Sequence, residues 1–148
     1  MKYQRQSGFS LIELMVTLAI VAIIASIAFP SYQASILKSK RSDGQELLLN
    51  ISARMERALY SDGEYKIDLQ KLGFDSAAAV SSPESYYKAT VLAATATCPV
   101  ANCFVVQATP QLGQADDGVM ELTSTGIKRR DKNNDGDFLD AGEDSWVN

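Results

Sequence analysis

The fold is decided by residues 8–30, which read GFSLIELMVTLAIVAIIASIAFP. The stretch from 9 to 29 is apolar and contains a single charged residue, Glu13. Because a helix rises about 1.5 Å per residue, this stretch is long enough to cross a hydrocarbon core about 30 Å thick. Lys2 and Arg5 precede it, so the positive-inside rule predicts a cytoplasmic N-terminus and an exported remainder.

A simple membrane anchor does not explain Glu13. A carboxylate inside an apolar membrane helix costs roughly 2.5 kcal/mol or more, so we expect it to have a cationic partner. If the chain is cut between Gly8 and Phe9, the new α-ammonium group lies about one helical turn from Glu13. The N-terminus of one copy could then pair with Glu13 of a neighbouring copy, which predicts a mechanism of assembly.

The motif of Gly8, Phe9 and Glu13, followed by the apolar run and Pro30, resembles the N-terminal signal of type IV pilins and type II secretion pseudopilins. In that family a prepilin peptidase cuts after the glycine and methylates the phenylalanine, and the glutamate directs docking into a helical filament. The resemblance implies processing at Gly8 and Phe9, and assembly roles for Phe9, Glu13 and Pro30. It also implies three kinds of partner, namely other pilin subunits, the peptidase and an inner-membrane assembly platform.

The same resemblance implies an α+β fold, in which a long N-terminal helix packs on an antiparallel sheet of three to four strands. The protein would lie in the inner membrane with a periplasmic domain before assembly, and in an extracellular pilus afterwards. The expected parts are a leader over residues 1–8, the membrane or filament-core half of the helix over residues 9–29, its amphipathic half over residues 30–60, and a globular domain over residues 61–148.

A cleaved secretory signal peptide is the alternative interpretation of the N-terminus. It has the same basic, apolar and small-residue regions, and here it would release a mature chain that begins at Phe29. Such a signal requires neither Glu13 nor a helical pattern that continues on both sides of Pro30. Under this alternative the product is a secreted, soluble calcium-binding module.

Composition excludes several classes of function. Removing Lys2 and Arg5 with the leader lowers the formal charge from −4 to −6, so we expect no nucleic-acid partner. The sequence contains no histidine, which is the commonest general base and metal ligand. It also lacks a nucleophile elbow, a phosphate-binding loop and a zinc-ligand spacing, so we expect no enzymatic activity.

Beyond Pro30, apolar residues recur at spacings of three, four and seven, which predicts an amphipathic helix packed on a sheet. Pro30 predicts a kink in this helix. Gly44 either loosens the helix or allows close packing. The opposite face, which includes Arg41 and Asp43, is expected to be solvated. The apolar stripe consists of Leu37, Gly44, Leu48, Ile51, Met55 and Ala58 or Leu59.

The remainder of the chain predicts an antiparallel meander. Ser61, Asp62 and Gly63 signal the end of the helix. One strand candidate ends in Ala108, Thr109 and Pro110 and the next ends in a glycine turn at Gly126, which resembles the pattern of PilE-type minor pilins. The expected connecting loops are residues 65–72 and 76–82, and the expected strands are residues 85–94, 104–109 and 119–127.

Cys98 and Cys103 lie between the first two predicted strands. The exported location is oxidising, so we expect them to form a disulfide that pins this turn. Two thiols alone cannot complete a tetrahedral metal site, and their spacing is not that of a redox pair. Many pilins close a C-terminal loop with a disulfide, whereas no cysteine follows Cys103 here, so that loop needs another constraint.

The C-terminal segment contains the first half of an EF-hand-like loop. Oxygen ligands stand at the first, third and fifth positions, with Gly136 at the sixth, whereas the twelfth position is Gly142 and the acidic residue is displaced by one. The oxygen donors favour calcium. A solvated acidic turn without metal is the alternative. The candidate ligands are Asp131, Asn133, Asp135, Asp137 and Glu143.

Together these features predict a type IV pilus subunit, more specifically a minor pilin that primes or joins a retractile filament used for motility, adhesion or uptake. A type II secretion pseudopilin is the alternative within the same superfamily, although the chain lacks the Tyr-Pro loop signature that follows the helix in those proteins.

Overall fold

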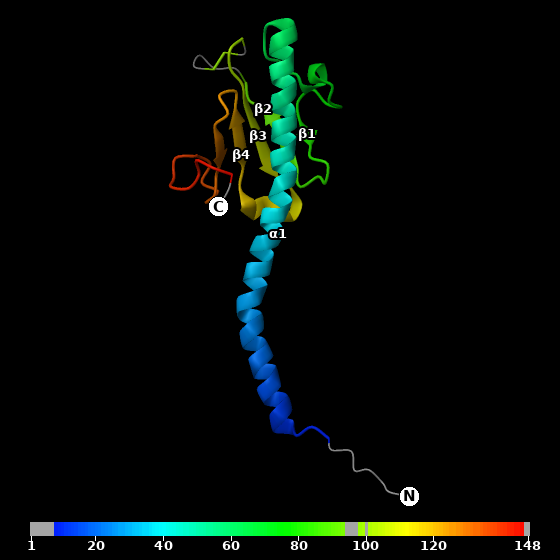
Figure 1. The fold of residues 1–148 in the computed structure, drawn as a ribbon, viewed down its shortest axis with the longest axis vertical. Helices are drawn as coiled ribbons and strands as arrows, with labels where there is room; N and C mark the ends of the chain where they lie inside the picture. The colour runs from blue at the N-terminus through cyan, green and yellow to red at the C-terminus, as the bar shows by residue number, and fades with distance from the viewer. Residues whose placement is uncertain (1–7, 94–97, 100, 147–148) are drawn as a thin grey trace, which may run out of the picture. The chain divides into compact units, whose positions relative to one another are not determined.

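The computed structural model describes residues 8–93, 98–99 and 101–146. One long helix opens the chain, and the strands follow it together with two short 3-10 helices (Figure 1). The elements in order are α1 (Leu11–Asp62), η1 (Leu69–Leu72), β1 (Val80–Ser81), β2 (Tyr87–Val91), β3 (Val105–Pro110), η2 (Leu112–Asp117), β4 (Met120–Thr123) and β5 (Lys128–Arg130).

The chain divides into two compact units, Met1–Ile36 and Leu37–Asn148, which we call the N-terminal unit and the head. In the N-terminal unit every residue from 8 to 35 is exposed. Helix α1 continues through Pro30 without ending, and the kink expected at this proline stays a prediction. Among the described residues α1 is the one helix that is long and apolar enough to cross a membrane.

The head contains a five-stranded antiparallel sheet with the order β1-β2-β3-β4-β5. Its central registers pair Ala89 with Ala108 and Ala108 with Met120. This meander, with α1 beside it, confirms the expected α+β fold. The strand count is higher than expected, because two short edge strands were not recognised in the sequence.

Both missed strands are short, as edge strands commonly are. β1 comprises only Val80 and Ser81, inside a segment expected to be a loop. The strand expected over residues 119–127 ends instead at Thr123, where a turn through Gly126 leads into β5. Gly126 has a φ of 82°, which a glycine adopts at no steric cost.

The apolar stripe of α1 packs on the sheet and forms the core of the head. Gly44 allows this contact, since a Cβ there would lie 2.6 Å from Met120 Cε and 2.6 Å from Tyr87 Cγ. Close packing is therefore the correct interpretation of Gly44. The largest fully buried apolar side chains include those of Tyr87, Leu48, Ile51, Met55, Leu69, Met120 and Val106.

Candidate functional site

Ser10 and Glu13 cap the N-terminus of α1. The Ser10 N–H donates to Glu13 Oε2 at 2.8 Å, and the Glu13 N–H donates to Ser10 Oγ at 3.3 Å. This reciprocal pair is a capping box, which satisfies backbone N–H groups that the first turn of a helix leaves without partners. Sequence reasoning considered only the charge of Glu13 and missed Ser10, although the Ser-x-x-Glu spacing is the signature of this cap.

Glu13 retains capacity for another donor. A carboxylate can accept about four hydrogen bonds, and in the described part of the chain the one hydrogen bond that the Glu13 carboxylate accepts is on Oε2. Phe9 is 92% exposed, and Gly8 has no neighbour that a Cβ would touch within 4 Å. The structure thus brings the expected processing site and the carboxylate together on an exposed surface. Pro30 lies several turns further along α1 and is not part of this group.

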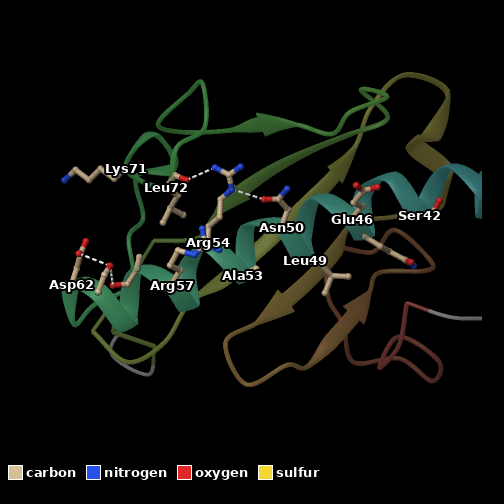
Figure 2. Close-up of a pocket in the computed structure, with 13 residues that line it drawn as sticks. Ser42, Glu46, Leu49, Asn50, Ala53, Arg54, Arg57, Asp62, Lys71 and Leu72 are labelled. Carbon is tan, nitrogen blue, oxygen red and sulfur yellow. Dashed lines mark hydrogen bonds between the residues drawn. The ribbon is translucent and has the colours of Figure 1, made fainter.

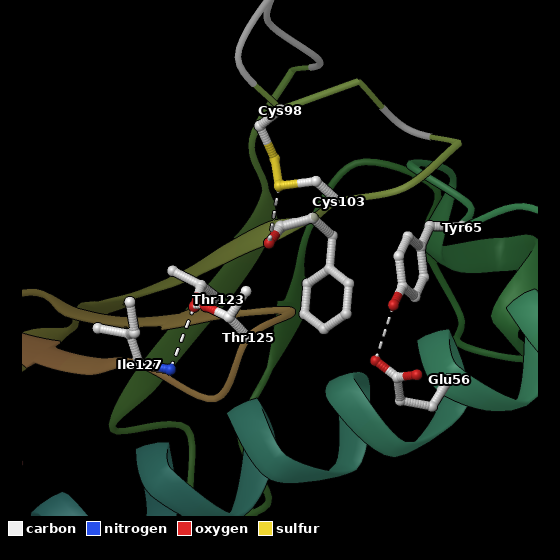
Figure 3. The surroundings of a disulfide bond; sticks show 8 residues. Glu56, Tyr65, Cys98, Cys103, Thr123, Thr125 and Ile127 are labelled. Carbon is white, nitrogen blue, oxygen red and sulfur yellow. Dashed lines mark hydrogen bonds between the residues drawn. A yellow bond between two sulfur atoms is a disulfide. The ribbon is translucent and has the colours of Figure 1, made fainter.

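Cys98 and Cys103 form a disulfide (Figure 3). Phe104, which follows Cys103, packs edge-on against Tyr65 with the ring centroids 4.8 Å apart. The Tyr65 hydroxyl donates to Glu56 Oε1 at 3.0 Å, and burial together with this glutamate raises the pKa of Tyr65. The disulfide therefore lies beside a contact between Phe104, just before β3, and Tyr65, just after α1.

The two buried carboxylates of the acidic loop bind backbone amides. Asp131 Oδ1 accepts from the Asp135 N–H at 3.2 Å, and Asp131 Oδ2 accepts from the Gly136 N–H at 3.0 Å. Glu143, which is 1% exposed, accepts from the Lys132 N–H at 2.8 Å and from the Asp140 N–H at 3.2 Å. These carboxylates hold the loop in place through its own hydrogen bonds.

The remaining candidate ligands lie on the outside of this loop. The Asn133 amide donates to Asp135 Oδ2 at 2.9 Å and to Asp140 Oδ2 at 2.6 Å, and Asp137 is exposed. Over the described ranges, no three His, Cys, Asp or Glu side chains are placed to hold a metal ion. The arrangement matches a hydrogen-bonded acidic turn, and calcium binding stays a prediction of the sequence.

A buried charge cluster joins α1, the sheet and η2. Arg41 Nε donates to Asp117 Oδ2 at 2.8 Å, and Arg41 Nη2 pairs with the other oxygen of Asp117. Arg130 Nη1 reaches Asp117 Oδ1 at 3.3 Å, and the Tyr87 hydroxyl donates to Asp117 Oδ2 at 2.5 Å. Burial and the neighbouring Asp117 raise the pKa of Tyr87 well above its ordinary value. The phenol therefore remains a hydrogen-bond donor to the carboxylate.

The same cluster holds the C-terminal segment. Arg41 Nη1 donates to the Trp146 carbonyl at 3.3 Å, and Trp146 Nε1 donates to the Glu121 carbonyl in β4 at 3.1 Å. Lys128 lies over the Trp146 ring, with its Nζ 4.9 Å from the centroid. These contacts constrain the segment that is closed by a disulfide in many pilins.

Asp43 is a second buried charged residue of α1, and it accepts hydrogen bonds from the turn between β1 and β2. Its carboxylate accepts from the Ser82 hydroxyl and from the Glu84 N–H, the latter at 3.1 Å. The expectation that Arg41 and Asp43 lie on a solvated face was therefore wrong. Both are buried because segments distant in sequence supply their partners.

The fold and the N-terminal segment define a class of protein. A helix with an exposed apolar first part, a glutamate in its first turn and an amphipathic second part packed on an antiparallel meander is the arrangement of a type IV pilin subunit.

Comparison with known proteins identifies the family. The model of the prokaryotic N-terminal methylation motif matches residues 3–29. The model described as "Type IV minor pilin ComP, DNA uptake sequence receptor" matches residues 30–123, more than half of the chain, and the chain belongs to this family.

Curated relatives are fimbrial proteins. The chain is 41% identical over 61 residues to the type IV major fimbrial protein FimA of Dichelobacter nodosus. The aligned region covers 41% of this chain and 38% of FimA. It is 33% identical over 92 residues to the type IV major alpha-pilin of Moraxella bovis, and the aligned region covers 58% of each chain. It is 48% identical over 44 residues to the fimbrial protein EcpC of Eikenella corrodens, and the aligned region covers 30% of this chain and 29% of EcpC. The matches thus span less than two thirds of each of these relatives.

Proposed function

We propose that this protein is a minor type IV pilin that is cut between Gly8 and Phe9, is methylated on Phe9 and enters a helical filament. The observation that carries the proposal is the exposed apolar part of α1 with Glu13 capping its start, inside the segment that matches the methylation motif. Such an apolar surface requires lipid or other subunits to cover it. The pilin acts by assembly and has no enzymatic activity.

Glu13 is the proposed assembly residue. The cap uses Oε2, and the other oxygen can accept from the α-ammonium group of Phe9 in a neighbouring copy. Before assembly the apolar helix holds the subunit in the inner membrane with the head in the periplasm, and afterwards the subunit lies in an extracellular pilus. The prepilin peptidase and the inner-membrane assembly platform are its partners in this sequence.

The mass and N-terminal sequence of the mature protein from its native membrane fraction test this proposal. We expect a chain that begins at Phe9 and carries one additional methyl group. A chain that begins at Phe29 without methylation would reject the filament role and support the secreted module. Copurification with sheared filaments at low abundance distinguishes a minor pilin from a major one, and copurification with a secretion system indicates a pseudopilin.

DNA binding is the second candidate, because the matching family is named for a receptor of DNA uptake sequences. The charge of this chain argues against it, since the processed protein carries a formal charge of −6. In the sheet, Arg129 of β5 is already paired with Glu121 of β4 at 3.3 Å, so its charge is partly neutralised. We therefore retain the prediction of no nucleic-acid partner. A gel shift with the full chain in detergent and duplex DNA at low salt tests it, and a salt-sensitive shift would overturn it.

A further inference from the structure

An open groove of about 930 Å³ runs along one side of α1 in the head. Figure 2 shows its lining from Ser42 to Asp62, with Lys71 and Leu72 of η1 beside the helix. Leu49, which is 48% exposed, and Ala53 give the groove an apolar floor. We call this feature the α1 groove.

One wall of the α1 groove is fixed by Arg54. Its Nη1 donates to the Leu72 carbonyl at 2.8 Å, and its Nε donates to Asn50 Oδ1 at 2.9 Å, as Figure 2 shows. The guanidinium group also lies 4.2 Å from the centroid of the Phe74 ring. This wall of the groove is therefore preformed, so binding a ligand would not require the loss of conformational entropy that ordering it would cost.

Two exposed cations line the α1 groove without a partner. Within the described residues, neither Arg57 nor Lys71 makes an ion pair or a side-chain hydrogen bond. Asp62, at the same end of the groove, is already paired with Lys66 at 3.3 Å. This end of the groove can therefore accept carboxylates from outside the subunit.

The acidic loop presents a matching projection. Leu139 is 87% exposed, and Asp137 and Asp140 flank it without ion pairs in the described structure. Asp137 Oδ1 accepts from the Leu139 N–H at 2.9 Å, and the Asp140 side chain is held by Asn133. An exposed leucine between two aspartates is thus displayed on a loop whose backbone is already ordered.

The projection and the cationic end of the α1 groove lie toward opposite ends of the head. Arg41 contacts the C-terminal segment at Trp146, whereas Arg57 is sixteen residues further along α1, a rise of about 24 Å. Figure 1 shows the red C-terminal segment away from the end of α1. A contact between two different patches on successive copies is heterologous, and it generates a helical filament when it does not close into a ring.

We propose that residues 137–140 of one copy dock in the α1 groove of the next copy. Leu139 covers Leu49 and Ala53, and the two aspartates of the loop face the two unpaired cations of the groove. Charge complementarity and the apolar floor commit the groove to a second copy of this chain. The inference rests on the proposed filament role and names the head contact that accompanies it.

A cysteine pair in the full chain tests this contact. We combine Leu139→Cys with Ala53→Cys, both at exposed positions, and analyse membranes and sheared filaments on non-reducing gels. A head-to-tail contact gives a ladder of dimers, trimers and longer species, whereas a two-fold contact gives only dimers. Each single variant is limited to dimers, and the parent chain shows any background from Cys98 and Cys103.

The outcomes separate this inference from the filament role. A ladder supports the contact. If the ladder forms in membranes while the filaments of the same cells lack this protein, the contact stands and the filament role alone is rejected. The double variant is overexpressed so that its copies adjoin in the filament. Filaments rich in it that give no ladder then overturn the contact alone, and the absence of both filaments and ladder overturns both. Leu139→Cys combined with Lys88→Cys, on the other exposed face of β2, is the control pair, and an equal ladder from it would also overturn the contact.

Charge exchange provides a second test. Changing Arg57 and Lys71 to Glu, or Asp137 and Asp140 to Lys, is expected to reduce the ladder by about two- to fivefold per contact, which is the range of exposed ion pairs. Combining both sets of changes is expected to restore it. No recovery in the combined variant would contradict the proposed pairing.

Discussion

The N-terminal unit and the head place their apolar residues in opposite ways. Phe29 in the N-terminal unit is 62% exposed, whereas Leu48 and Ile51 in the head are fully buried, although α1 supplies all three. The first stretch of the helix therefore needs lipid or other subunits to cover it, whereas the next stretch is covered by the sheet of the same chain.

Glu13→Ala gives the largest expected effect, and it is confined to the N-terminal unit. Loss of one partner from a desolvated ion pair costs about 3 kcal/mol or more, so we expect entry into filaments to fall by about a hundredfold. The variant should remain processed and membrane-bound, because an apolar helix without a charge inserts more readily. Immunoblots of sheared filaments and membranes measure both pools.

Ser10→Ala is the matched control for Glu13→Ala. It removes the serine side of the capping box and leaves the carboxylate in place, so it should cost only about 1 kcal/mol of helix stability. Filament entry near that of the parent chain would assign the effect of Glu13 to docking. Equal loss in both variants would instead assign it to the helix cap and contradict the docking role.

Asp117→Ala tests the head. It leaves Arg41 and Arg130 buried without their shared carboxylate, so we expect a loss of about 3–5 kcal/mol in the free energy of unfolding. Trp146 is the only tryptophan and contacts the cluster through its carbonyl, so its fluorescence during urea unfolding in detergent measures the change.

The neighbouring variant Asp116→Ala is the control, because Asp116 is exposed and should change stability by no more than about 0.5 kcal/mol. Membrane insertion should be unaffected in both variants, since the apolar helix is unchanged. Reduced insertion of the Asp117 variant would contradict this expectation and show that the stability of the head affects membrane insertion.

Gly44→Ala has a smaller expected effect on the head. The added methyl group would meet Met120 and Tyr87 at 2.6 Å, and such overpacking costs about 1–3 kcal/mol. The same unfolding experiment measures it. Gly113→Ala is the control, since a Cβ there meets nothing within 4 Å. Equal stability of the two variants would mean that α1 and the sheet can separate without cost.

The features predictable from sequence are those that local patterns encode. Apolar periodicity predicted α1 and its buried stripe. β-Branched and aromatic residues predicted β2 and β3, and alternation predicted β4. The burial of Arg41 could not be predicted, because its partner Asp117 lies 76 positions away. Asp43 is similar, with Ser82 at a separation of 39. Charged residues at helix positions look solvated until the partner segment is known.

The site divides in the same way. The spacing of Gly8, Phe9 and Glu13 is a local signal, so the sequence was sufficient to place them together. The α1 groove depends on η1 folding back against α1, with Arg54 reaching Leu72 at a separation of 18 positions. No periodic pattern in α1 encodes that contact.

Calcium binding is expected to have the smallest effect on the stability of the head. The loop already satisfies Asp131 and Glu143 with backbone amides, so a cation would have to replace these bonds. With the affinity of extracellular sites, for which dissociation constants are about 0.1–1 mM, calcium at about 2 mM is expected to add about 0.6–1.8 kcal/mol to the free energy of unfolding. The measurement is the thermal midpoint in calcium and in chelator at equal ionic strength. Magnesium is the control, because its strict octahedral geometry suits this loop poorly. Equal midpoints would contradict calcium binding and leave the hydrogen bonds of the loop, together with Arg41 and Trp146, as the constraint that replaces a C-terminal disulfide.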